Sequence, residues 1–127
     1  MADRNDLCSW SALELAAGIR SKLISSSEAT EAALARIEQL NPGINAVVTV
    51  TAELARKQAK TADEAVARGD VLRPLHGVPY TLKDLTATAG IRTTMGSKVF
   101  DGIPTRDDIV AERLRERGGG VLIGKTN

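Results

Sequence analysis

The segment PLHGVPYTLKDL, residues 74–85, contains several apolar side chains and closes with a lysine, an aspartate and a leucine. Successive side chains of a strand point to opposite faces, so Thr81 and Lys83 would share one face while Tyr80 and Leu82 take the other. Burial of a lysine amine is costly when it is charged, and it lowers the pKa of the amine from an ordinary value of about 10.4. A lysine brought to about 7–8 in this way can act as a general base at neutral pH. The sequence therefore makes Lys83 a candidate catalytic residue.

A structural interpretation stands beside this one, in which Lys83 is a solvated lysine whose stem lies over apolar neighbours. Burial is not visible in a sequence, so the residues alone leave both interpretations open. Two neighbouring features favour the catalytic one. Asp84 can hold the turn after the strand, and the loop at residues 86–97, TATAGIRTTMGS, is rich in small hydroxylated residues that let a substrate or another loop come close.

A second lysine belongs to GGVLIGKT, residues 119–126, which fits the phosphate-loop pattern G-x-x-x-x-G-K-[ST]. A phosphate loop needs a strand before its first glycine and a helix that begins at its lysine, because the helix N-terminus cradles the phosphates. Here a helical segment precedes Gly119, and residues 121–123 are typical of a buried strand. We therefore expect no nucleotide site at this match.

Helices and strands alternate along the chain. The expected helices cover residues 11–23, 25–43, 52–68 and 104–120, and the expected strands cover residues 44–50, 74–85, part of 88–97, and 121–127. This order predicts an α/β layered fold with a largely parallel or mixed sheet. Ligand sites of such sheets lie beyond the carboxyl ends of strands, and two of the expected strand ends carry polar groups, Lys83-Asp84 and Lys125-Thr126-Asn127. The sequence also stops directly after the second of them, which favours a truncated site.

Local signals define most helix ends. The S-x-x-E spacing of a capping box opens the first two helices, at Ser11 and Ser25. We expect residues 41–43, Asn-Pro-Gly, to end the second helix, and Thr105 to be the N-cap of the last one. Gly69 is expected to take a left-handed C-cap after the third.

The composition narrows the class of protein. The 127 residues suit one domain or a piece of a larger one, with 43% apolar residues for a core and only 2% aromatic ones. The net charge of +1 is spread along the chain, and no apolar run approaches the roughly 20 residues of a membrane helix, so neither nucleic acid nor a membrane is an expected partner. The single cysteine, Cys8, predicts a reduced, cytoplasmic setting. We expect no metal or cofactor, and a structural role for His76.

Two longer segments carry a family resemblance. Residues 74–97, PLHGVPYTLKDLTATAGIRTTMGS, and residues 102–127, GIPTRDDIVAERLRERGGGVLIGKTN, resemble the N-terminal part of amidase signature enzymes. These include bacterial amidases and the A subunit of glutamyl-tRNA amidotransferase. The likeness runs from about Ser11 to the end, and it is made specific by the HGVP-x-x-x-KD element and the terminal GKTN.

The resemblance implies an α/β/α fold around a large mixed sheet, of which this chain would be an incomplete N-terminal part. It also implies hydrolysis of a carboxylic amide by a serine–serine–lysine triad, without a metal. The family's lysine falls on Lys83, whereas its nucleophilic serine, its bridging serine and its glycine-rich oxyanion loop lie downstream of GKTN. Ser97 and the other serines of the chain match neither triad serine. In this chemistry a neutral lysine takes the nucleophile's proton through the second serine, and the activated serine attacks the amide carbonyl.

Three hypotheses follow. In the first, residues 1–127 are the N-terminal portion of a single amidase domain that acts on a small amide, mainly helical over residues 1–70 and α/β over residues 71–127, and inactive when isolated. In the second, the chain belongs to an ammonia-supplying amidotransferase A subunit with a companion subunit. In the third it is a non-catalytic, truncated partner module, whose exposed strand edges pair with a second copy or with a complementing C-terminal portion.

Overall fold

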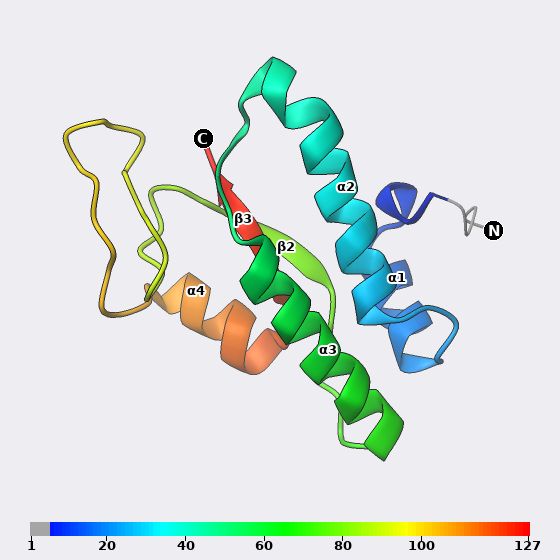
Figure 1. Ribbon diagram of the computed structural model, residues 1–127. Coiled ribbons are helices and arrows are strands. Elements are labelled where there is room, and N and C mark those ends of the chain that lie inside the picture. Colours follow the sequence, from blue (N-terminus) through cyan, green and yellow to red (C-terminus); the bar gives the residue numbers. More distant parts are fainter. Residues whose placement is uncertain (1–5) are drawn as a thin grey trace.

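The computed structural model describes residues 6–127, which form a three-stranded sheet with helices on both of its faces (Figure 1). The helical elements are η1 (Leu7–Ser9), α1 (Ala12–Arg20), α2 (Ser26–Ile44), α3 (Ala52–Arg68), α4 (Ile109–Glu112) and the π-helical turn η2 (Arg113–Gly118). The strands are β1 (Val47–Val50), β2 (Pro79–Lys83) and β3 (Val121–Thr126). β3 lies in the centre, parallel to β2 and antiparallel to β1. The predicted mixed sheet is confirmed.

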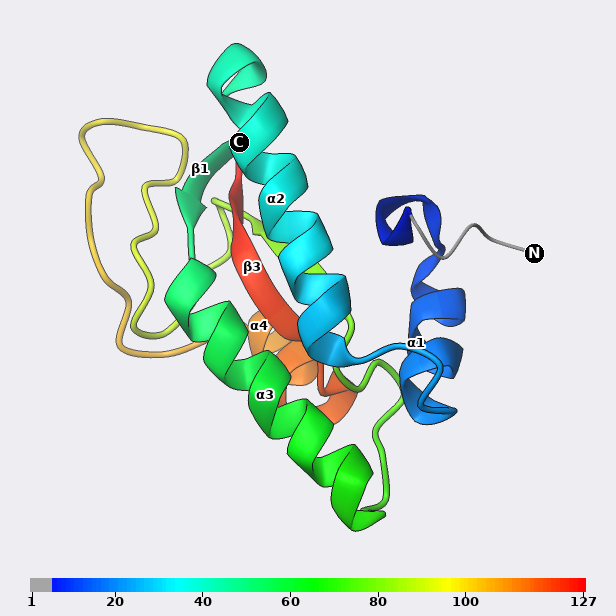
Figure 2. The ribbon, with the colours of Figure 1, turned by 45° about the vertical axis from the view of Figure 1, so that its right-hand side comes forward.

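Each face of β3 packs against different helices (Figure 2). On one face, Val121 and Ile123 join a buried cluster with Leu34 of α2 and two alanines of α3. On the other face, Leu122 joins a cluster with Leu82 of β2, Ile91 and Ala111 of α4. Figure 2 shows α2 and α3 in front of β3, with α4 behind it. Side chains on both faces of β3 are buried, and the sequence at the start of this strand is therefore a continuous apolar run, as is typical of central strands.

The predicted helix caps are mostly confirmed. Ser11 and Ser25 both form reciprocal capping boxes, with Glu14 and Glu28 respectively. Gly69 adopts the left-handed conformation at the end of α3, with a φ of 78°. These caps can be predicted from the sequence because each depends on residues only a few positions apart.

The predicted end of α2 is wrong. The helix continues through Pro42 to Ile44, and Asn45 takes the left-handed C-cap position. The Asn45 N–H donates to the Asn41 carbonyl at 2.6 Å, and the Asn41 side chain makes a two-way pairing with the backbone of Val47 at 2.8 and 2.9 Å. These contacts hold the last turn together although Pro42 has no N–H to donate.

The last helix begins three residues later than predicted, at Ile109, with Asp108 as its N-cap instead of Thr105. The two aspartates before Ile109 accept hydrogen bonds from a distant loop. Asp108 accepts the Ala87 N–H at 2.7 Å, and Asp107 accepts the Ala89 N–H at 2.6 Å. Of the short strand expected within residues 88–97, the described chain shows an isolated bridge between Thr93 and Gly102.

A glycine is required at position 124 because β1 crosses β3 closely there. A Cβ added to Gly124 would lie 2.7 Å from both the Thr49 carbonyl oxygen and Val47 Cγ1. We expect Gly124→Ala to destabilise the fold by about 1–3 kcal/mol, the usual cost of overpacking, as a fall in the midpoint of urea denaturation. Gly43→Ala is the matched control, since Gly43 lies in α2 with no atom within 4 Å of the added Cβ. A Gly124→Ala midpoint equal to that of Gly43→Ala would contradict the close crossing.

Candidate functional site

Lys83 is the last residue of β2, at the carboxyl end of the strand, as predicted. Its side chain is exposed, so the burial required by the general-base argument is not found in this chain. β2 is an edge strand of the sheet, paired only on its β3 side among the described residues. Lys83 borders a hollow of about 140 Å³, lined by Lys83, Asp84, Leu85, Gly96, Thr126 and Asn127. The two predicted polar strand ends therefore do meet at one place.

Asp84 holds the turn after β2, as predicted. It is 2% exposed, and one of its carboxylate oxygens accepts hydrogen bonds from the Thr94 N–H at 3.1 Å and from the Thr94 hydroxyl. The Asp84 N–H donates to the Thr126 carbonyl at 2.7 Å, and its carbonyl accepts the Met95 N–H at 3.1 Å. The backbone that carries Lys83 is thus fixed to β3 on one side and to residues 94–95 on the other.

The buried lysine of this region is Lys125, which the sequence indicated as a polar group of a strand end and as the lysine of the rejected phosphate-loop match. It is 0% exposed, and its Nζ donates to the Thr86 carbonyl at 2.7 Å and to the Thr93 hydroxyl at 2.9 Å. Its Nζ also lies 3.9 Å from Asp84 Oδ1. Burial lowers the pKa of the Lys125 amine, and the negative charges of Asp84 and Asp108 partly oppose that effect. A signal for this burial was present, because Lys125 follows directly on a continuous apolar run.

A one-residue irregularity in the β2–β3 pairing decides which way these lysines point. Tyr80 pairs with Leu122, but the next residue, Thr81, pairs with Gly124, so Ile123 has no partner on β2. Such a bulge shifts the alternation of side chains along the bulged strand by one position. From Gly124 onward, each side chain of β3 therefore points to the face opposite to the one it would take in a regular strand.

The consequence is that the two lysines lie on opposite faces. Paired residues of neighbouring strands point to the same side of a sheet. Leu82 pairs with Lys125, and Leu82 belongs to the cluster on the α4 side. Lys83 pairs with Thr126, so both point to the other face. Lys125 is thereby directed towards the loop of residues 86–94, and Lys83 towards the hollow.

The phosphate-loop match is excluded by this geometry. Its first glycine, Gly119, precedes β3 and its second, Gly124, lies within that strand, so no loop joins them; the lysine of the match is a buried strand residue bonded to Thr86 and Thr93. No helix begins at this lysine within the described residues.

Neither His76 nor Cys8 contributes to the hollow. His76 Nε2 lies 3.0 Å from the Ala62 carbonyl, a contact that fits the structural role expected of this residue, and the exposed Cys8 thiol lies 3.4 Å from the Ala32 carbonyl. Residues 6–127 contain no group of three or more histidine, cysteine, aspartate or glutamate side chains that could hold a metal ion. None of the helices in this range has both the length and the apolar character needed to cross a membrane.

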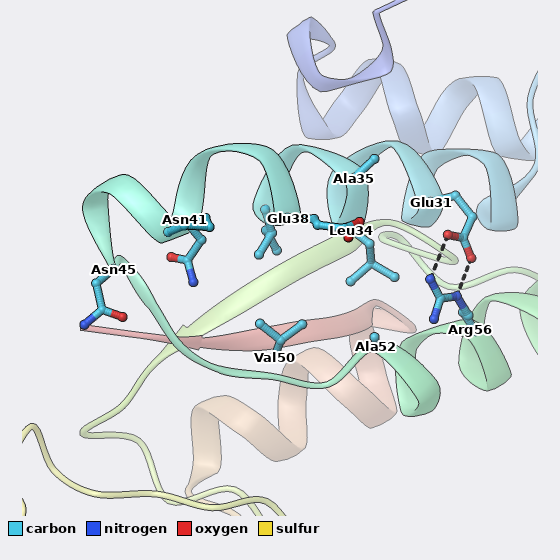
Figure 3. A pocket seen from close by; sticks show the side chains of 11 residues that line it. Glu31, Leu34, Ala35, Glu38, Asn41, Asn45, Val50, Ala52 and Arg56 are labelled. Atoms are coloured by element: carbon cyan, nitrogen blue, oxygen red, sulfur yellow. Dashed lines mark hydrogen bonds and ion pairs between the residues drawn. The ribbon is translucent and has the colours of Figure 1, made fainter.

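A larger groove, of about 550 Å³, lies between α2, β1 and the start of α3, and Lys83 does not line it (Figure 3). Its floor is apolar, with Leu34, Val50 and Ala52 directed into it. An ion pair between Glu31 and Arg56, at 2.6 Å, spans one end. The groove contains no residue that the sequence singled out for chemistry.

Comparison with known proteins places these features in a family. A model of the amidase family matches residues 28–127. The chain is 48% identical over 118 residues to the A subunit of the glutamyl-tRNA(Gln) amidotransferase of Carboxydothermus hydrogenoformans, and 43% identical over 118 residues to an acylamidase of Rhodococcus erythropolis. Each alignment covers 92% of this chain and 24% of the relative.

The solved structures agree. The peptide amidase of Stenotrophomonas maltophilia superposes with a TM-score of 0.85 and 33% identity, over 94% of this chain and 25% of that enzyme. The chain thus spans about a quarter of the length of the relatives it matches. The resemblance drawn from the HGVP-x-x-x-KD and GKTN elements is confirmed: this chain belongs to the amidase family.

Proposed function

We propose that this chain is the lysine-bearing part of an amidase that hydrolyses the C–N bond of a carboxylic amide, with Lys83 as the catalytic base. The observation that carries the proposal is the position of Lys83 in a member of the amidase family. Its amine stands at the carboxyl end of a strand, beside a hollow that also borders the carboxyl end of the neighbouring parallel strand. Ligand sites of α/β sheets lie at such ends.

The proposed chemistry needs two hydroxyls that the family resemblance places outside these residues. An uncharged Lys83 amine accepts the proton of a bridging serine, and that serine accepts the proton of the nucleophilic serine. The nucleophile adds to the amide carbonyl, the C–N bond breaks, and the protonated nitrogen leaves as ammonia or an amine. Water then cleaves the ester and releases the acid.

Lys83 must be covered for this to work. A lysine in open solvent is charged at neutral pH and cannot accept a proton. The proposal therefore requires that further protein close over the hollow beside residues 83–85 and 126–127. This requirement is consistent with a chain that spans a quarter of its relatives' length, and it supports the prediction that residues 1–127 alone are inactive.

The direct test is amide turnover by the full-length protein that carries this chain. We expect acid and ammonia or amine to be released in equal amounts from simple aliphatic or aryl carboxamides, detected by mass spectrometry and an ammonia assay. Residues 1–127 expressed alone should show no turnover. Turnover by the short chain that disappears in Lys83→Ala, or no turnover of any amide by the full-length protein, would contradict the proposal.

A second candidate function is that of an ammonia-supplying amidotransferase A subunit, which the 48% identity to the C. hydrogenoformans protein favours. It differs from the first in its partners. Under this alternative, purification of the full-length protein from its own cells brings companion subunits with it, and glutamine is hydrolysed better than simple amides. The cytoplasmic location expected from the single cysteine stays a prediction under both.

A further inference from the structure

Lys125 is a buried cation that the proposed chemistry does not use, yet its hydrogen bonds lead to Lys83 in two steps. Its Nζ donates to the Thr86 carbonyl at 2.7 Å. The N–H of the same Thr86 donates to the Lys83 carbonyl at 2.9 Å. Thr86 therefore connects the buried ammonium of β3 to the backbone of the last residue of β2.

A second route reaches the same backbone through Asp84. Lys125 Nζ lies 3.9 Å from Asp84 Oδ1, a buried oxygen that accepts no hydrogen bond from the described residues. The other carboxylate oxygen of Asp84 accepts from Thr94. The Thr93 hydroxyl accepts from Lys125 at 2.9 Å and donates to the Ile91 carbonyl at 3.1 Å. The ammonium thus joins residues 84, 86 and 93 around one point.

Stability alone gives a weak reason to keep a charge there. Removing an ammonium and a carboxylate from water costs several kcal/mol each, and apolar residues of similar volume often leave a fold as stable or more so. Such a replacement would not reproduce the two hydrogen bonds of the Lys125 amine. An apolar side chain cannot fix the Thr86 carbonyl and the Thr93 hydroxyl at set distances.

We propose that Lys125 is a positioning residue for Lys83, holding the turn of residues 84–86 and the segment of residues 91–94 so that the Lys83 amine keeps one direction in the hollow. This inference rests on the proposed function of Lys83. The bulge at Ile123 contributes to this positioning, because it directs the Lys125 side chain to the loop side of the sheet while Lys83 faces the hollow.

The test is a set of variants of the full-length protein, assayed on its best amide substrate. Thr93→Val removes the hydroxyl that accepts from Lys125 and keeps the shape of the side chain. We expect it to lower kcat about tenfold, and Lys125→Met to lower it about a hundredfold, with KM within twofold of the parent in both, since small misplacements of a catalytic group are known to cost up to about a hundredfold. Thr93→Ser keeps the acceptor and should retain the parent kcat.

Thr30→Val is the matched control, because Thr30 is equally buried and its hydroxyl has no partner among the described residues. It should retain the parent kcat. All rates are taken per folded protein, well below the melting temperature of each variant. If Lys125→Met fails to fold, Thr93→Val decides the question.

The inference is overturned if folded Thr93→Val keeps the parent kcat, if Thr93→Ser loses as much as Thr93→Val, or if the loss appears in KM alone. Failure of the proposed function looks different. In that case the unmodified protein turns over no amide, or Lys83→Met keeps full activity.

Discussion

An Asp84→Ala variant is expected to be among the least stable single variants of this chain, with a loss of about 3–5 kcal/mol in the free energy of unfolding. The substitution leaves the buried Lys125 ammonium without its counter-charge, 3.9 Å away, and breaking a buried pair from one side typically costs this much. It also deprives the Thr94 N–H and hydroxyl of their common acceptor. The measurement is the midpoint of urea denaturation of the full-length protein, followed by circular dichroism.

Two further variants separate the charge from the hydrogen bonds. Asp84→Asn keeps an oxygen for Thr94 and should lose less, and adding Lys125→Met to it should recover stability, because no uncompensated charge remains. Asp101→Ala is the matched control, since Asp101 forms an exposed ion pair with Arg92, and such pairs contribute little. Equal midpoints for Asp84→Ala and Asp101→Ala would contradict the role assigned to the buried carboxylate.

The sequence predicted well those features that depend on near neighbours. The capping boxes at Ser11 and Ser25 and the left-handed Gly69 are each complete within four residues or fewer. The turn held by Asp84 was also foreseen, because an aspartate at a strand end readily bonds to nearby backbone. The mixed sheet followed from the alternation of helices and strands.

Features that depend on tertiary contacts were missed. The last helix starts at Ile109 because Asp107 and Asp108 bind the N–H groups of residues 87 and 89, about twenty positions earlier in the chain. No capping rule contains such a partner. At α2 the missed contact is closer in the chain: Asn41 pairs with the backbone of Val47, six residues later, and the helix continues past the proline that was expected to end it.

At the candidate site, too, the local features were predicted and those that depend on the whole fold were missed. The sequence placed Lys83 at a strand end with the correct face, but its exposure depends on β2 lying at an edge of the sheet. The burial of Lys125 depends on β3 lying in the centre and on the bulge at Ile123, which changes the face of every residue after it. Strand order and register are set by the whole fold, and alternation along one strand does not reveal them.

The second large effect is expected at Lys83. Lys83→Met should lower kcat/KM of the full-length protein for its best amide at least a thousandfold, because the nucleophile loses its proton acceptor, and losing a member of a catalytic triad typically costs that much or more. The urea midpoint should not fall, because the amine makes no hydrogen bond or ion pair with the described residues, and replacing a covered lysine by an apolar side chain removes the cost of burying its amine. Lys60→Met, at an exposed lysine of α3 that does not line the hollow, is the matched control and should change neither quantity.

The role of Lys83 is therefore decided by kcat/KM of the Lys83→Met protein, measured beside its urea midpoint. We expect a loss of at least about a thousandfold in a protein no less stable than its parent. A variant that keeps amide turnover within a few-fold of the parent would show that the amine at the end of β2 is not the base.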